Sequence, residues 1–176
     1  AAIDRGTGRY ALSFNGSNTS VVTPQLGTSL PNFTLAAWIK STTAGGVVFT
    51  ELGQATPNVS WHDSQVEVET NGTIKVCVWT GALSCVNAGT SVSFNKWHHV
   101  VLTYTGTTLS GYVDGILGAS NGSVTKQYPN TGATYYGIGP ADSTNGGNGV
   151  AFSGSIDEAR IYNRALTATE IKRLYN

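Results

Sequence analysis

Apolar and polar residues alternate with a period of two along most of the 176-residue chain. Successive side chains of an extended strand point to opposite sides, so this period predicts strands with one buried face. The alternating runs are 11–14, 33–41, 47–52, 66–70, 74–79, 98–104, 108–114 and 154–162. Turn residues separate them, among them Asn71-Gly72, Asp114-Gly115 and the glycine-rich segment 142–149. Short strands with such turns predict an all-β fold, a two-sheet antiparallel β-sandwich or jelly roll.

One helix is predicted, at the C-terminal end. Thr167 and Glu170 have the spacing of a capping box, in which the side chain of each residue accepts a hydrogen bond from the backbone amide of the other. Ile171 and Leu174 follow on one helix face. No internal repeat or linker divides the chain. We therefore expect residues 1–176 to form a single domain with one short C-terminal helix.

Composition narrows the classes of partner. Charged residues make up 11% of the chain, compared with about 25% in an average globular domain. The ten basic and ten acidic residues cancel, and a neutral chain without basic runs is not expected to bind nucleic acid. No apolar run approaches the ~20 residues of a membrane-spanning helix, so we expect no membrane insertion. Because the chain contains no methionine, we expect a processed module of a larger secreted protein.

The two cysteines, Cys77 and Cys85, flank the segment Thr80-Gly81-Ala82. A hairpin centred on Gly81 would place the two sulfurs opposite each other, which predicts a cross-strand disulfide. Two buried reduced thiols are the alternative. A disulfide indicates an oxidising and therefore extracellular compartment.

Residues 97–115 concentrate a tryptophan, two histidines and an aspartate. On a strand over 98–104, His98 and His99 point to opposite faces, so they cannot share a metal ion. Asp114 precedes Gly115 in a predicted type I′ turn, which requires positive φ at both positions. We therefore interpret these residues as scaffold.

Four segments of the chain resemble a known family. They are FNGSNTSVV, FTLAAWIKS, KWHHVVLTYTGTTLSGYVDG and FSGSIDEARIYNRALTATEIKRLY. In their order and separations they resemble LamG/pentraxin-like jelly-roll domains of the concanavalin A-like lectin/glucanase superfamily, over almost the whole chain. The resemblance implies a sandwich whose curved face or connecting loops bind ligands, as in modules of secreted bacterial polysaccharide-degrading enzymes, lectin-like proteins and adhesins. It also implies that Trp38 and Trp97 lie in the core.

The resemblance further implies a structural calcium ion (Ca²⁺) near Asp157, held together with a Phe-Asp-Gly-x-x-Asp stretch near the N-terminus. The corresponding residues of that stretch are Asn15 and Asn18, whose uncharged amides would hold calcium more weakly than carboxylates. An ordinary Asx turn explains the same two asparagines. A structural calcium and a plain turn therefore both remain open.

A glycan-cleaving active site would need paired carboxylates. Related glucanases carry Glu-x-Asp-x-x-Glu on one strand. The nearest approach here is Glu67 and Glu69, which share a strand face but lack the third carboxylate. Asp157 and Glu158 are neighbours on a strand and face opposite sides. We therefore expect no catalytic residues and no enzyme.

Sugar binding depends on exposed aromatic rings and on polar groups that reach sugar hydroxyls. Trp61 has polar neighbours and is the leading candidate for a stacking platform, and Trp79 ends the first strand of the cysteine hairpin. Of the neighbours Tyr135 and Tyr136, one must face outward and the other inward. The full set of candidate carbohydrate-binding residues is Trp61, Trp79, Tyr128, Tyr135, Tyr136, Asp142 and Asn145.

The sequence thus predicts a non-catalytic, lectin-like carbohydrate-binding module that targets a secreted bacterial polysaccharide-active enzyme or surface protein to glycans. Its expected partners are a polysaccharide or other glycan and the other domains of the parent protein. The alternatives are an extracellular adhesion or protein-interaction domain and, less favoured, a glycan-cleaving enzyme.

Overall fold

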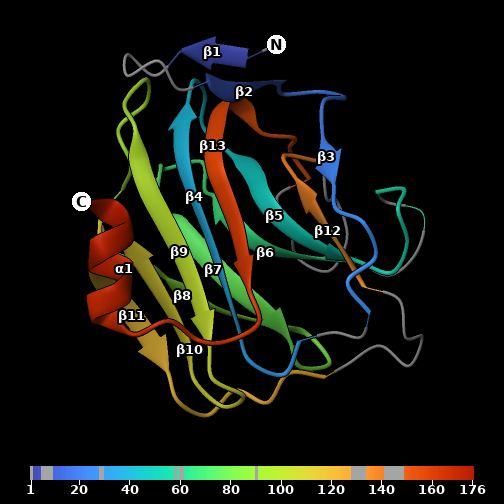
Figure 1. Ribbon diagram of the computed structural model, residues 1–176, viewed down its shortest axis with the longest axis vertical. Coiled ribbons are helices and arrows are strands. Elements are labelled where there is room, and N and C mark those ends of the chain that lie inside the picture. The colour runs from blue at the N-terminus through green and yellow to red at the C-terminus, as the bar shows by residue number, and fades with distance from the viewer. Residues whose placement is uncertain are drawn as a thin grey trace.

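Two antiparallel sheets lie face to face, and one short helix covers the outer side of one of them (Figure 1). The computed structural model describes residues 2–4, 10–27, 30–57, 59, 62–89, 91–127, 134–140 and 149–176. The two-sheet antiparallel β-sandwich predicted from the alternation of the sequence is therefore confirmed.

The seven-stranded sheet has the strand order β1-β2-β13-β4-β9-β10-β11. Its strands are β1 (Ala2–Asp4), β2 (Tyr10–Asn15), β4 (Phe33–Ser41), β9 (His98–Tyr104), β10 (Leu109–Val113), β11 (Ile116–Asn121) and β13 (Ser153–Tyr162). The six-stranded sheet has the order β3-β12-β5-β6-β7-β8. Its strands are β3 (Val21–Val22), β5 (Gly46–Leu52), β6 (His62–Val68), β7 (Ile74–Trp79), β8 (Leu83–Asn87) and β12 (Tyr135–Ile138).

The core lies between the sheets and consists of the inward-facing half of each alternating strand. Leu35 and Leu102 come from the seven-stranded sheet, and Phe49, Val66 and Val76 come from the six-stranded sheet. All five side chains are fully buried. Each burial of this kind stabilises the fold by about 1.5–3 kcal/mol, so the alternation of the sequence fixes which face of each strand turns inward.

Trp38 and Trp97 do not lie in the core, and the expectation drawn from the resemblance is wrong. On β4, Leu35 and Ile39 point into the core, so Trp38 points to the other side of the sheet. There it stacks on Tyr175, with 5.6 Å between ring centroids and 20° between ring planes. Both tryptophans are half-buried.

Helix α1 (Ala168–Tyr175) packs against the outer side of the seven-stranded sheet (Figure 1). Ile171 is buried against Ala36 and Val101, and Leu174 packs against the same cluster. This confirms the apolar face predicted from the sequence. In the described ranges, no helix is long and apolar enough to cross a membrane.

The capping box of α1 is also confirmed. Thr167 Oγ1 accepts a hydrogen bond from the Glu170 amide at 3.3 Å, and Glu170 Oε2 accepts one from the Thr167 amide at 2.8 Å. Arg164 binds both carboxylate oxygens of Glu170. Together with Thr167, this guanidinium lowers the pKa of Glu170 to about 2.

Strand β6 begins earlier than predicted. The sequence predicts a strand over 66–70, whereas β6 runs from His62 to Val68. Its first half reads His-Asp-Ser-Gln, a polar run that hides the alternation. Nevertheless His62, Asp63 and Gln65 are buried, with exposed fractions of 7%, 3% and 0%.

An ion pair buried inside the sandwich accompanies these polar residues. Lys126 Nζ lies 2.7 Å from Glu51 Oε2, and both side chains are 1% exposed. Gln65 Nε2 donates a hydrogen bond to the same Glu51 oxygen at 2.9 Å. The Lys126 ammonium also lies 5.6 Å from the ring centroid of Phe33 in β4. The pair therefore ties β5 and β6 to the segment that follows β11 and to the opposite sheet.

The two histidines are scaffold, as predicted. The Ser93 amide donates to His98 Nε2 at 3.0 Å, so the ring proton resides on Nδ1 and is donated to Asp114 Oδ2 at 2.8 Å. Asp114 and Gly115 have φ angles of 52° and 75°, which confirms the positive φ expected for both positions of the turn.

His99 points to the opposite side of β9, where it lies beside Trp38 and Tyr175 and is 3% exposed. Burial lowers its pKa from 6.5 to about 4, although the carboxylates of Asp114 and Glu158 act in the opposite direction. The folded protein therefore keeps His99 neutral at a pH where the unfolded chain protonates it.

We expect the free energy of unfolding to fall as the pH is lowered from about 6.5 to about 4. In this window the unfolded chain binds one more proton at His99 than the folded protein does, and the difference amounts to about 3 kcal/mol. Urea unfolding of the wild type and of His99→Phe at pH 7, 5.5 and 4 measures the effect. The same loss in His99→Phe would assign the acid sensitivity to other groups.

We expect Lys126→Met to destabilise the fold by about 3–5 kcal/mol, because it leaves the Glu51 carboxylate buried without its cation. The double variant Glu51→Gln/Lys126→Met should recover part of this loss, since no charge is then buried. Urea unfolding measures both. The exposed Lys172→Met in α1 is the control and should change stability by less than about 0.5 kcal/mol. Equal losses in Lys126→Met and Lys172→Met would contradict the importance of the pair.

Candidate functional site

The side of the six-stranded sheet that faces away from the core brings together an aromatic ring, a charged cluster and the two cysteines. On β7, Val76 and Val78 point into the core, so Lys75, Cys77 and Trp79 point away from it. Residues paired directly across strands share a face. The resulting outer face comprises Leu52, His62, Glu67, Lys75, Cys77, Trp79, Cys85 and Tyr135, with Glu69 at its border.

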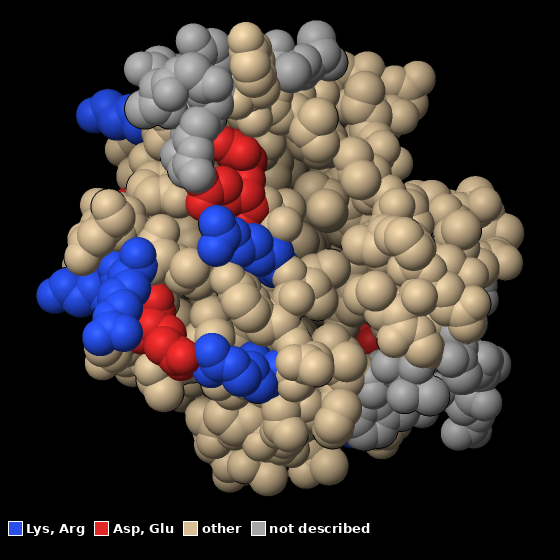
Figure 2. Space-filling model, viewed as in Figure 1, with Lys and Arg blue, Asp and Glu red and all other residues tan. Residues whose placement is uncertain are grey.

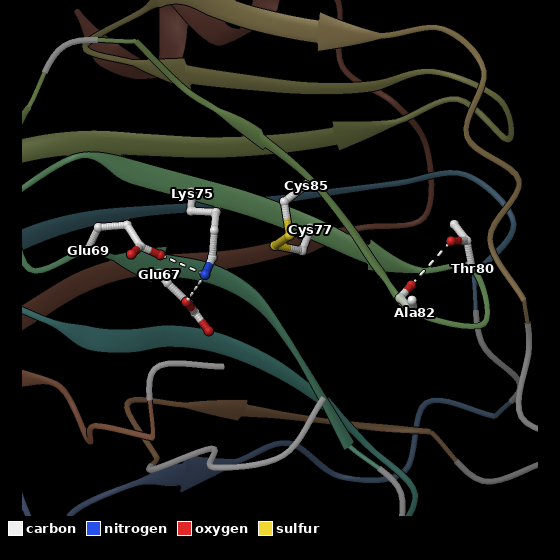
Figure 3. The surroundings of a disulfide bond; sticks show 7 residues. All are labelled: Glu67, Glu69, Lys75, Cys77, Thr80, Ala82 and Cys85. Carbon is white, nitrogen blue, oxygen red and sulfur yellow. Dashed lines mark hydrogen bonds and ion pairs between the residues drawn. A yellow bond between two sulfur atoms is a disulfide. The ribbon is translucent and has the colours of Figure 1, made fainter. Parts of the chain in front are cut away.

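Cys77 and Cys85 are direct partners in the β7–β8 hairpin and form a disulfide (Figure 3). The hairpin turns over Thr80–Ala82, where the Thr80 amide donates to the Ala82 carbonyl at 2.8 Å. Gly81 has a φ of 99°, which a residue with a side chain rarely adopts. The predicted disulfide is confirmed, and it joins β7 to the edge strand β8 on the outer face.

Glu67, Glu69 and Lys75 form the charged cluster of this face (Figure 3). Lys75 Nζ lies 2.9 Å from Glu67 Oε2 and 2.6 Å from Glu69 Oε1. Burial alone would lower the pKa of Lys75, but its hydrogen bonds to the two carboxylates outweigh burial and raise that pKa. The Glu67 side chain is 0% exposed, whereas those of Lys75 and Glu69 are 19% and 29% exposed.

This geometry differs from that of a glycosidase. Such an enzyme needs two carboxyl groups that flank the scissile bond, one of them holding a proton. Here Glu67 and Glu69 instead converge on one ammonium group, that of Lys75. The cluster is therefore an ion-paired group, in which the partly exposed Glu69 can accept hydrogen bonds from a ligand.

Trp79 ends β7 and is half-buried. Its carbonyl accepts a hydrogen bond from the Gln127 amide at 2.8 Å. The backbone of Trp79 is thus held between the hairpin and the segment that contains Lys126. The indole is a partly exposed ring on this anchored backbone, and an exposed aromatic ring is what stacking against a sugar requires.

Tyr135 and Tyr136 face opposite ways, as the alternation of the sequence predicts. Tyr136 is fully buried in the core cluster, so its ring is closed to a ligand and it leaves the set of candidate contacts. Tyr135 is half-buried on the outer face. It pairs with Leu52, and Leu52 pairs with His62 on its other side, so the three residues form one row across β12, β5 and β6.

Four of the candidate residues lie outside the described residues: Trp61, Tyr128, Asp142 and Asn145. Their role in binding stays a prediction.

The residues expected to hold calcium do not converge on one point. Asn15 Oδ1 accepts hydrogen bonds from the amides of Ser17, Asn18 and Thr19, and Asn15 Nδ2 donates to Asn18 Oδ1 at 2.8 Å. Asn15 pairs with Ser153 of β13, and Asp157 follows four residues later, about 13 Å along the strand. The three residues do not fit one ion in this arrangement, and the asparagines form a turn that satisfies its own polar groups.

Asp157 lies instead at a hollow of about 310 Å³ at the edge of the sandwich. The hollow is lined by Tyr10, Leu12, Ile138, Ile156 and residues 157–159. Asp157 Oδ1 accepts a hydrogen bond from the Glu158 amide, and Glu158 pairs with Arg160. This hollow is formed by β2, β13 and Ile138 of β12, and it shares no lining residue with the outer face.

The alternation and motifs of the sequence do not predict two ion pairs of this region. The partnership of Lys75 with Glu67 has a signal in the sequence, because the Asn71-Gly72 turn joins the two strands and sets charges of opposite sign across from each other. The Glu51–Lys126 pair leaves no such signal in the sequence, because 75 residues separate the two side chains along the chain.

The family model described as the concanavalin A-like lectin/glucanases superfamily matches residues 15–172. The chain therefore belongs to this superfamily, as the resemblance of its segments indicates. No match is found among curated proteins.

Solved structures share the fold at low sequence identity. The SAP-like pentraxin of Limulus polyphemus is 19% identical, with a TM-score of 0.70 over 93% of this chain and 80% of that chain. Domain 4 of AbnA, a GH43 extracellular arabinanase from Geobacillus stearothermophilus, was solved with arabinotriose and is 20% identical (TM-score 0.67, 100% and 81% covered). The CBM40 of a Ruminococcus gnavus sialidase was solved with α2,3-sialyllactose and is 14% identical (TM-score 0.67, 94% and 96% covered).

We expect Asn15→Ala to destabilise the protein by about 1–2 kcal/mol, because the backbone amides of the turn lose their acceptor. The loss should be the same in calcium and in EDTA, since the asparagine oxygens are used within the turn. Thermal unfolding of both proteins in the two buffers measures this. If the wild type instead melts at a lower temperature in EDTA than in calcium, the protein holds a structural calcium ion.

Proposed function

We propose that this chain is a non-catalytic carbohydrate-binding module that binds glycan on the outer face of the six-stranded sheet. One observation carries the proposal: the half-buried indole of Trp79 and the partly exposed Lys75–Glu69 pair lie on the same face of a hairpin closed by a disulfide. An aromatic ring offers a surface to the apolar side of one pyranose, and the charged groups, about 13 Å away along β7, can bind hydroxyls of another unit of the same glycan.

The rigidity of this surface supports the proposal. The Cys77–Cys85 disulfide lies between Lys75 and Trp79 along β7, and the Gln127 amide holds the Trp79 backbone. A surface that is already formed loses less conformational entropy when it binds a ligand. Superfamily membership, and relatives solved with arabinotriose and with sialyllactose, add weight to glycan as the ligand class.

The module would serve a larger secreted protein. A domain that binds a polysaccharide but does not cleave it acts by raising the local concentration of an attached domain at its substrate. The disulfide is consistent with an oxidising, extracellular location. We therefore propose that this chain keeps a polysaccharide-active enzyme or a surface protein at its glycan.

A protein-interaction domain is the second candidate. Strand β11 lies at the edge of the seven-stranded sheet, carries no charged residue, and exposes Ile116 and Leu117 by 71% and 50%. Uncharged apolar edge strands are prone to pair with another chain. This role would leave the outer face without a ligand, so polysaccharide binding distinguishes the two candidates.

We expect Trp79→Ala to weaken binding about tenfold, the effect of losing one aromatic stacking contact, while Trp79→Phe retains most of the affinity. Affinity electrophoresis in native gels that contain arabinan, galactan, xylan or hydroxyethylcellulose measures the dissociation constants. Tyr10→Ala is the matched control. It removes an aromatic ring that belongs to the seven-stranded sheet and is 70% exposed. If neither these polymers nor acidic ones slow the migration of the protein, the result would favour the protein-interaction role.

A further inference from the structure

The basic residues of the chain are distributed unevenly between the two sheets. The chain has ten lysines and arginines. The described strands of the six-stranded sheet contain one of them, Lys75. The segments that enter or leave its strands add two more, Lys126 and Lys96. Five others, Lys40, Arg160, Arg164, Lys172 and Arg173, lie in strands of the other sheet, in α1 or between β13 and α1. Arg5 and Arg9 lie outside the described residues.

Charged side chains gather instead over the opposite side of the molecule. Figure 2 views the side that carries the seven-stranded sheet and α1, where lysine, arginine and acidic side chains cluster over β13 and α1. Among them are the Glu158–Arg160 and Arg164–Glu170 ion pairs. Lys96 lies near this sheet as well, because the amide of its neighbour Asn95 donates to the Ser41 carbonyl of β4 at 2.7 Å.

The two lysines of the six-stranded side are both engaged by carboxylates. Lys75 is shared between Glu67 and Glu69 at 2.9 and 2.6 Å. Lys126 is 1% exposed and is paired with Glu51 between the sheets, where no ligand on the outer face can reach it. Neither lysine is a free cation that could bind an anion.

The charge of the outer face also has a definite sign. Glu67 and Glu69 contribute two negative charges and Lys75 contributes one positive charge, so the cluster has one negative charge in excess. A sugar carboxylate or sulfate is bound in proteins by charge-assisted hydrogen bonds, above all by the bidentate guanidinium of arginine. On this face such a group would meet carboxylates, which repel it.

We propose that the outer face selects neutral glycans and rejects glycans that carry carboxylate or sulfate groups. This inference rests on the proposed function and adds the substrate class. Hydroxyl groups of one unit of a neutral glycan can donate to Glu69 and accept from Lys75, while another unit of the same glycan stacks on Trp79, about 13 Å further along β7. The two glutamates also act as specificity residues, because they neutralise the one lysine that would otherwise attract an anionic sugar.

The test compares one polymer in three forms. Each polysaccharide that retards the protein in native gels is used unmodified, carboxymethylated, and hydroxyethylated to the same degree, so that the last form controls for the added bulk. Polygalacturonate and dextran sulfate are included as acidic polymers. At 50 mM salt we expect carboxymethylation to weaken binding about tenfold or more, hydroxyethylation to have a smaller effect, and the acidic polymers not to bind.

The double variant Glu67→Gln/Glu69→Gln frees the Lys75 ammonium. We expect it to bind the carboxymethylated polymer about tenfold more tightly than the wild type does, with an affinity that falls as salt is raised. Glu69→Gln alone, at the more exposed glutamate, should shift binding in the same direction if the double variant does not fold. Glu158→Gln, on the other sheet, is the control and should leave the ranking of the polymers unchanged.

The outcomes separate the inference from the proposed function. Tighter binding of the wild type to carboxymethylated or acidic polymers than to neutral ones would overturn the neutral selectivity and leave carbohydrate binding in place. Binding to no polymer of either kind would overturn the proposed function and the inference together. A preference for neutral polymers that reverses in the glutamine variants would support both.

Discussion

Each strand of this sandwich can bury only one of its two faces between the sheets, and the rest of the structure depends on that constraint. The apolar positions of β4, β9, β6 and β7 fill the space between the layers. The positions between them must then face either solvent or another element. Helix α1 covers part of one outer side, where Ile171 packs on Ala36 and Val101. The outer side of the other sheet is where the aromatic ring, the charged cluster and the disulfide meet.

Buried polar groups follow a second constraint, since an ion taken out of water must find a partner. Lys126 and Glu51 satisfy each other inside the sandwich, with Gln65 as a third member. Glu67 is fully buried and pairs with Lys75. Outside the core, the partly exposed Asp114 accepts hydrogen bonds from the His98 ring and the His99 amide. Much of the small number of charged residues in this chain is therefore used for architecture, which explains why residues that look reactive in the sequence are scaffold.

Membership of the superfamily accounts for the fold of this chain. Relatives that share the sandwich were solved with a neutral arabinotriose and with an acidic sialyllactose, so the fold by itself does not decide which class of sugar is bound. In our proposal for this chain, the distinction depends on Lys75 and on the two glutamates that share it. The same disulfide-closed hairpin carries Lys75 and Trp79, which couples the stability of the fold to the shape of the proposed binding surface.

The amino-acid sequence by itself determined the features that depend on neighbours along the chain. Alternation determined which side chains of strands such as β4 and β7 turn into the core. The spacing of Thr167 and Glu170 determined the helix cap, and the Thr80–Ala82 turn determined the partnership of Cys77 with Cys85. Only the tertiary structure decided that Tyr136 is closed to ligands and that Trp38 lies under α1. It also decided that the polar run at the start of β6 is buried, because its partners Glu51 and Lys126 come from distant segments and periodicity carries no information about such contacts.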